Sequence, residues 1–148
     1  MAKVSYKLPD EMIEKMSKLG DKYDDITKTV LEEGAKPLFD IAKYNLSDSI
    51  GKDTKQDSRS KGDLLKSIRT TRPFLDKNGS WGIKVGCEGI DSKGVSNALK
   101  ASVLEHGKSD QDARPWLKPS GSKAKKECIE RMKKTLEAEV DKLWVFMN

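Results

Sequence analysis

The sequence predicts an α+β fold: a small antiparallel sheet built on a β-hairpin, packed by a long N-terminal helix, a short helix and a long C-terminal helix. Apolar residues recur at helical spacing over residues 21–46 and again over 122–143. Between these segments, two alternating runs flank Asn78-Gly79, the strongest short-range signal for a hairpin turn. At 148 residues, we expect residues 1–148 to form a single domain.

The N-terminal part carries two helical patterns. Pro9 and Asp10 mark the start of a first helix and Gly20 marks its end. A second pattern runs from about residue 21 to 46 and contains a glycine and Pro37. Because a proline inside a helix costs about 3 kcal/mol and kinks the axis, we expect one long bent helix or two abutting ones.

Residues 47–62 follow, rich in Ser, Asp, Lys and Gly, with Ile50 as their single apolar residue. Loops of this length are uncommon inside compact domains and are usually functional or disordered. We expect a flexible loop at about 47–62 that could become ordered on assembly.

Two strands are expected on either side of the turn DKNG, over residues 67–75 and 80–88. The second strand places four residues on one face: Trp81, Ile83, Val85 and Cys87. The glycines at 82 and 86 lie on the opposite face, which indicates a close backbone approach or a bulge.

Two helices are expected in the C-terminal part. The short helix covers about residues 96–105 and ends at Gly107. Its apolar stripe consists of Ala98, Leu99, Val103 and Leu104. The long helix covers about residues 122–143, and its buried stripe consists of Cys128, Ile129, Met132, Leu136, Val140 and Leu143. The chain closes with the apolar sequence LWVFMN, which we expect to dock or to protrude as an anchor.

Charge is distributed unevenly along the chain. Residues 10–33 hold eight acids and four bases, a net charge of −4. Residues 52–77 hold eight bases and four acids, and residues 114–134 hold eight bases and two acids. This separation suits nucleic acid, and it equally suits head-to-tail packing of identical subunits. Solvated helix faces would produce it as well.

Cys87 and Cys128 are too few for a disulfide scaffold, so we expect free thiols in a reducing cytosol. The N-terminus has no apolar signal-peptide region, and no 18-residue apolar run is present. We therefore expect neither a signal peptide nor a membrane span.

The single histidine, His106, adjoins Glu105, but adjacent helical residues point about 100° apart and do not readily form a catalytic dyad. No nucleophile motif and no phosphate-binding glycine loop occur, and one histidine with scattered acids is a poor metal-ligand set. We expect no enzyme activity, no catalytic residue, no cofactor and no metal. His106 is interpreted as a helix-end residue whose ring packs or forms a hydrogen bond locally.

Two binding interpretations remain. A small basic nucleic-acid-binding protein is the alternative function, although the basic segments lack the interleaved aromatic residues that stack on bases. In ARPWLKP, Pro115 and Pro119 exclude helix on both sides, so Trp116 is expected on an extended segment. Trp116 is either an interface hot spot or a core residue that fixes the segment to the sheet.

LEHG, ARPWLKP and the long charged helix after them resemble the tail-component family of long-tailed bacteriophages, which includes tail-completion and head–tail joining proteins. The residues that match its signature are Glu105, Gly107, Ala113, Arg114, Pro115, Trp116 and Pro119. His106 replaces the usual aromatic residue and Ser120 the usual alanine. A second segment, KGDLLKSI, matches at Gly62, Leu64, Ser67 and Ile68, while Lys61 replaces a threonine.

The resemblance covers nearly the whole chain and implies a non-enzymatic virion structural protein of a phage or prophage. It implies a ring subunit at the head-proximal end of the tail, with a hexamer as one ring number. The implied partners are copies of itself and other phage neck or tail proteins. At most non-specific DNA contact and no membrane are implied. Assembly would take place in the host cytoplasm, and the assembled protein would reside in the virion.

The stretch from Glu105 to Pro119 is then expected to join the short helix to the long C-terminal helix. Its structural and interaction residues are Glu105, Gly107, Arg114, Pro115, Trp116 and Pro119. We expect Arg114 to pair with a carboxylate, Glu105 being the candidate, and to hold the turn closed.

Overall fold

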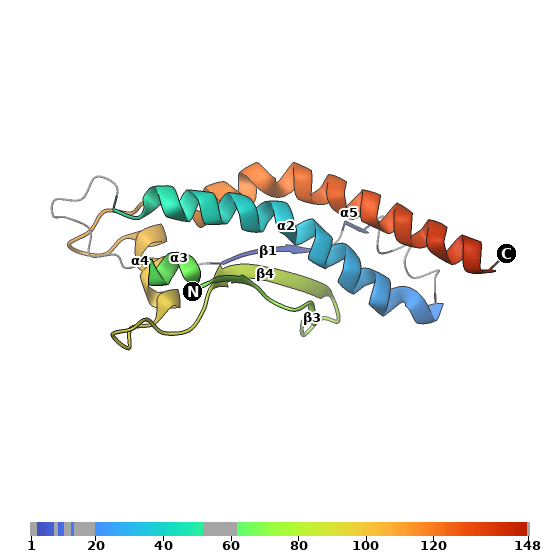
Figure 1. Ribbon diagram of the computed structural model, residues 1–148, viewed down its shortest axis with the longest axis horizontal. Helices are drawn as coiled ribbons and strands as arrows, with labels where there is room; N and C mark the ends of the chain where they lie inside the picture. The colour runs from blue at the N-terminus through green and yellow to red at the C-terminus, as the bar shows by residue number, and fades with distance from the viewer. Residues whose placement is uncertain (1–2, 8, 11–12, 14–19, 52–61, 148) are drawn as a thin grey trace.

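The computed structural model describes residues 3–7, 9–10, 13, 20–51 and 62–147. As predicted, the fold is α+β. Helices α2 (Tyr23–Ser49) and α5 (Leu117–Met147) lie side by side along one face of a four-stranded antiparallel sheet (Figure 1). The short helices α3 (Asp63–Lys66) and α4 (Asn97–His106) lie at one end of this sheet. The C-terminal end of α5 lies at the other end of the long axis.

Helix α2 follows a short 3-10 turn at Gly20–Lys22 and is one continuous helix with Pro37 inside it. Figure 1 shows it as a curved rod, in line with the long bent helix that the sequence predicts. It ends at Ser49, so the first residues of the predicted loop are helical. Residues 52–61 of that loop lie outside the described residues, as does most of the helix expected from Pro9 to Gly20.

The two long helices run antiparallel and approach closely at a glycine. A Cβ added to Gly34 of α2 would overlap the Cγ of Met132 on α5. Near the other end of the pair, the Asn45 amide donates to the Ser120 hydroxyl at 2.8 Å. The predicted stripe of α5 is confirmed at its centre, where Cys128, Met132 and Leu136 are buried. A residue without a side chain at position 34 therefore sets how near α5 can lie.

Strand β4 (Trp81–Cys87) is the central strand of the sheet. It pairs with β1 (Val4–Lys7) on one side and with β2 (Ile68–Thr70) and β3 (Phe74–Leu75) on the other. The predicted hairpin is thus confirmed, although its first strand is interrupted at residues 71–73. The predicted inward face of β4 is also confirmed, because Ile83, Val85 and Cys87 are buried and Trp81 is half-buried.

The hairpin turn is held by the carboxylate of Asp76. Its Oδ1 accepts hydrogen bonds from the backbone N–H groups of Asn78 at 2.8 Å and Ser80 at 2.9 Å. Gly79 has a φ of +76°, a conformation that glycine adopts without steric cost. On the outer face of β4, the ring of Phe74 lies over Gly82, where an added Cβ would come within 3.2 Å of it. The close approach expected at Gly82 is therefore made by a side chain.

Strand β1, like the short helix α3, was not predicted from the sequence. Val4 pairs with Val85 of β4, and its side chain lies against Gly121 of α5, where a Cβ would come within 2.9 Å. Four residues are too few for alternation to be recognised as a strand signal. The strand forms because β4 offers an edge and α5 leaves room at a glycine.

The core consists of two neighbouring clusters, one around the sheet and the α4–α5 region and the other between the start of α2 and the later part of α5. Cys87 and Cys128 form no disulfide and are buried in the first cluster, and burial raises the pKa of the Cys87 thiol. None of the described helices combines the length and the apolar character that crossing a membrane requires. For the sequence LWVFMN, only the side chain of Leu143 is described, and it packs on the second cluster.

Candidate functional site

Helix α4 ends where the sequence predicts, at Gly107, where both the backbone conformation and the close approach of the next loop require a glycine. The N–H of Gly107 donates to the carbonyl of Val103 at 2.7 Å, and its φ is +75°. A Cβ at this position would lie 2.8 Å from the backbone nitrogen of Ala113 and 2.9 Å from the carbonyl oxygen of Gln111. Gly107 therefore lets the loop that follows α4 fold back against the end of this helix.

The carboxylate of Glu105 holds the start of α5. Its Oε2 accepts hydrogen bonds from the backbone N–H groups of Trp116 and Leu117, both at 2.8 Å. Its Oε1 accepts a third bond from the N–H of Lys118 at 3.0 Å. The first N–H groups of a helix have no partner within the helix, and the positive end of the helix dipole favours a carboxylate there. Because Glu105 is buried, these three N–H groups take the place of water as hydrogen-bond donors to its carboxylate.

The expected ion pair between Arg114 and Glu105 is wrong. The Arg114 guanidinium donates instead to the carbonyl of Ser49 at the end of α2, at 3.3 Å. Its backbone N–H donates to the carbonyl of Leu104 at 2.7 Å. Arg114 thus ties the loop to both α2 and α4, while Glu105 is committed to the backbone of α5.

The last helix begins at Leu117, five residues before the predicted start, and includes Pro119. The expectation that Pro119 excludes helix is therefore wrong. A proline is tolerated in the first turn, because the N–H that it lacks would have no partner there. Pro115 and Pro119 are both exposed.

Trp116 directly precedes α5 and is fully buried. Its Nε1–H donates to the carbonyl of Ala101 on α4 at 3.2 Å, so the polar end of the indole is satisfied. The Ser120 hydroxyl donates to the Trp116 carbonyl and accepts from Asn45 of α2. This placement favours the core interpretation of Trp116 over the exposed anchor.

The structure thus brings together Glu105, Gly107, Arg114 and Trp116 as one join between α4 and α5. His106 is the last residue of α4, as expected, but its side chain is exposed, so the expected packing of the ring is wrong. Within the described part of the chain, no cluster of three or more His, Cys, Asp and Glu side chains could hold a metal ion.

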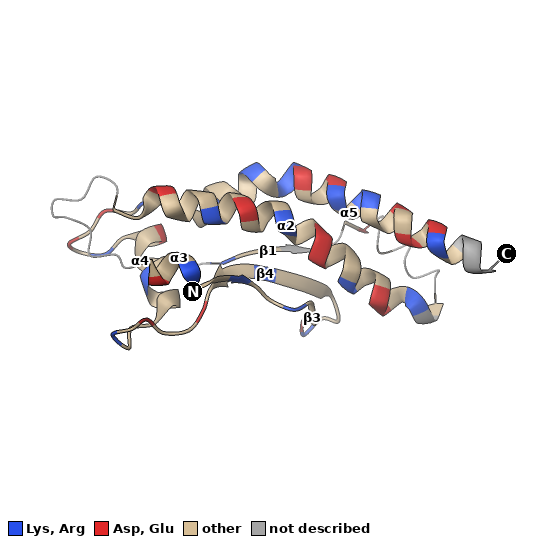
Figure 2. Cartoon of the chain, viewed as in Figure 1, with Lys and Arg blue, Asp and Glu red and all other residues tan. Residues whose placement is uncertain are grey.

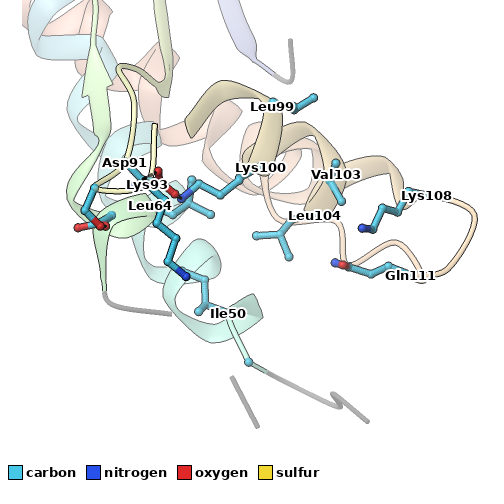
Figure 3. Close-up of a pocket in the computed structure, with 13 residues that line it drawn as sticks. Ile50, Leu64, Asp91, Lys93, Leu99, Lys100, Val103, Leu104, Lys108 and Gln111 are labelled. Carbon is cyan, nitrogen blue, oxygen red and sulfur yellow. Dashed lines mark hydrogen bonds and ion pairs between the residues drawn. The ribbon is translucent and has the colours of Figure 1, made fainter. Parts of the chain in front are cut away.

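A pocket of about 440 Å³ opens beside this join, between the end of α2, helix α3 and helix α4 (Figure 3). Its apolar lining residues are Ile50, Leu64, Leu99, Val103 and Leu104. Leu99 is 60% exposed, so its predicted place in a buried stripe of α4 is wrong. The buried residues of α4 are Asn97, Ala101, Leu104 and Glu105. We call this surface the α4 pocket.

The rim of the α4 pocket is ordered by Asp91. Its Oδ2 accepts from the Lys100 ammonium at 2.6 Å, and Oδ1 accepts from the N–H groups of Lys93 and Val95, both at 2.8 Å (Figure 3). The Lys100 bond, followed by the Val95 bond, lowers the pKa of the Asp91 carboxyl to about 2. The rim is therefore a fixed charged loop at neutral pH, beside an exposed leucine.

Both signs of charge occur along both long helices (Figure 2), but their balance differs between the two ends of the helix pair. Between Leu117 and Lys126, α5 carries four lysines and no acid. The later part of α5 and the start of α2 lie together at the opposite end, because the helices are antiparallel. The acids there are Asp24, Asp25, Glu137, Glu139 and Asp141. Lys28 and Lys142 also lie there, so this end carries a net negative charge and the start of α5 a net positive one, whereas the sequence suggested one acidic and one basic helix.

A family model described as "Bacteriophage HK97-gp10, putative tail-component" matches residues 10–107, which are 98 of the 148 residues. The chain belongs to this HK97-gp10-like family. The resemblance found in the sequence is thereby confirmed, and the HK97-gp10-like chain is a bacteriophage tail component, a part of the virion. No curated protein and no solved structure gives a significant match.

The family match includes the segment Lys61–Ile68 and the end of α4 at Gly107. It stops before Arg114–Pro119, so the role of that segment in this HK97-gp10-like protein rests on its geometry. Sequence reasoning identified these residues as a join, but it assigned the wrong partner to Glu105 and did not find the α4 pocket. Only the three-dimensional arrangement brings Ile50, the residue after α2, into one pocket with Leu104 of α4.

We predict that Glu105→Ala destabilises the fold by about 2 kcal/mol or more, because it leaves three N–H groups at the start of α5 without their acceptor. Glu105→Gln keeps one acceptor oxygen and should lose less. Urea denaturation measures both. Glu127→Ala, on the exposed side of α5, is the matched control and should change stability by less than about 0.5 kcal/mol. Equal effects at 105 and 127 would show that Glu105 does not hold the helix.

We predict that Trp116→Ala costs about 3–5 kcal/mol, because it removes a large, fully buried side chain. Trp116→Phe keeps most of the apolar contact but loses the bond to Ala101, so it should cost less. Thermal melts run beside a sizing measurement separate the two interpretations of this residue. A Trp116→Ala chain that melts like the parent but assembles poorly would restore the interface interpretation.

Proposed function

We propose that the chain is a non-enzymatic subunit of a homo-oligomeric ring at the head-proximal end of the tail, acting in tail completion or head–tail joining. The observation that carries this proposal is the α4 pocket, an exposed apolar surface at one end of an elongated tail component. Exposed apolar patches with a polar rim mark protein contact sites. The partner at the pocket is another neck or tail protein.

The charge separation supports a head-to-tail contact within the ring. A heterologous contact joins two different surfaces of identical subunits, and it closes into a ring when the rotation returns to the start. Opposite charges at the two ends of the helix pair favour such an arrangement over a contact between identical surfaces. A hexamer is one ring number that fits the proposal.

A second candidate, the small basic nucleic-acid-binding protein, is favoured by the lysine-rich start of α5. These lysines are interleaved with no exposed aromatic residue, which limits them to phosphate contacts. In the ring, they would make at most sequence-blind contact with passing DNA, and that contact would weaken steeply with added salt.

Native mass spectrometry of the purified chain tests the ring. We expect one closed oligomer with a single stoichiometry across a tenfold range of protein concentration. Open-ended oligomers that grow with concentration, or a chain that stays monomeric, would contradict a ring.

We further predict that Leu99→Glu lowers the yield of infectious particles about tenfold or more, because a charge at the α4 pocket opposes apolar docking. The variant should fold and form the ring, since Leu99 is 60% exposed. Leu75→Glu is the matched control, because Leu75 is 56% exposed and lies on β3, outside the pocket. Complementation of a phage lacking this gene measures both. Equal yields from the two variants would remove the docking role.

A further inference from the structure

Among the described residues, no further strand pairs with the outer side of β1 or of β2, so the sheet has two different open edges there. On β2, the N–H of Thr71 donates to the carbonyl of Lys84 at 2.8 Å, and the carbonyl of Ser67 accepts from Glu88 at 3.1 Å. In an antiparallel ladder, the backbone groups of alternate residues face the partner strand. Thr70 therefore directs its N–H and its C=O away from β4, towards the open edge.

The same alternation applies to β1. The even-numbered residues of β4 face β2, so Ile83 and Val85 face β1, where they pair with Tyr6 and Val4. Ser5, between these two, directs its N–H and C=O away from the sheet. Ser5 is exposed, as is Thr70 on the opposite edge. Each edge thus presents backbone donors and acceptors to a further strand.

A groove of about 390 Å³ runs beside the β2 edge, between this strand and helix α2. Phe39 and Ile83 contribute apolar surface to it, and Glu32, Lys36 and Arg72 contribute charge. A strand added to β2 would therefore gain side-chain contacts as well as backbone bonds, which is how strand addition acquires specificity.

We propose that the β1 edge of one copy pairs with the β2 edge of the next, so that the sheet continues from subunit to subunit. This contact deepens the proposed ring and rests on it. Because β1 and β2 are both antiparallel to β4, they are parallel to each other. Rotation about a ring axis that runs along the strands keeps that direction, so the pairing between copies is parallel.

The β1 and β2 edges meet the requirement for a contact between identical subunits in a ring. They are different surfaces of one chain, as a closed heterologous contact requires. Of the charged residues that line the groove beside β2, Glu32 is opposite in charge to Lys3, next to β1, whereas Lys36 and Arg72 have the same charge as Lys3. An extended segment of an unrelated virion protein on the β2 edge is the competing occupant, and it would leave the β1 edge without a role.

Proline substitutions at the edges test the contact. Thr70→Pro and Ser5→Pro each remove an N–H that points outward, so the ladders to β4 stay intact. We expect both variants to fold, as judged by circular dichroism and melting, and to appear as monomers in native mass spectrometry under conditions where the parent forms the ring. Lys77→Pro, in the exposed hairpin turn, is the matched control and should form the ring.

A mixture of Thr70→Pro and Ser5→Pro tests whether β1 of one copy pairs with β2 of another. Each retains one intact edge, so the mixture should give heterodimers through the remaining β1–β2 pair and nothing larger. A ring that survives both prolines overturns this contact alone, whereas a parent that stays monomeric overturns the contact and the ring together. If only Thr70→Pro disrupts assembly of the purified chain, the β2 edge contacts a surface of the next copy other than β1, and the β1–β2 pairing is overturned.

If the prolines impair folding, disulfide crosslinking replaces them. Ser5 lies opposite Lys84 and Arg69 lies opposite Gly86, so both are on the outer face of the sheet. A chain carrying Ser5→Cys and Arg69→Cys should give a ladder of covalent oligomers on oxidation, up to the ring number, since the native thiols are buried. The single variants should give no ladder. If the double variant forms the ring but gives no covalent oligomers on oxidation, the contact is overturned.

Discussion

The structure depends on one carboxylate. Glu105 sits in the last turn of α4 and accepts hydrogen bonds from three consecutive N–H groups where α5 begins. A helix start needs such acceptors, and a buried carboxylate needs such donors, so each satisfies the other. The direction of the 31-residue helix α5 is therefore set by a ten-residue helix that is short and locally defined.

From this join, the constraint spreads through close contacts. Trp116 fixes α5 to α4, and the Ser120 hydroxyl connects the Trp116 carbonyl to Asn45 of α2. Further along α5, Gly121 admits Val4 of β1, while Met132 fills the space that Gly34 leaves on α2. The small residues lie where two elements approach most closely. The spacing of the helix layer, and its position over the sheet, therefore follow from where α5 starts.

The features that local sequence determines were predictable. The hairpin followed from Asn78-Gly79, and the end of α4 followed from Gly107, because both conformations are chosen within a few residues. The partner of Glu105 was not predictable, because it depends on a contact eleven to thirteen residues away. Pro119 shows the same limit, since a proline is a helix breaker or a first-turn residue according to where the helix begins. Strand β1 and the exposure of Leu99 likewise depend on what lies next to them in space.

The edges of the sheet show how a subunit can assemble without aggregating. An open strand edge pairs with almost any extended chain, so natural proteins shorten or block it. Here the Arg69 guanidinium donates to the Ile68 carbonyl at 2.8 Å, which occupies one of the outward groups of β2. The backbone groups of β2 that remain available to a further strand are mainly the N–H and C=O of Thr70. One residue is too few to hold a strand by backbone hydrogen bonds alone. Pairing at this edge then requires the side chains of the groove beside α2, and only a partner that fits both would stay bound.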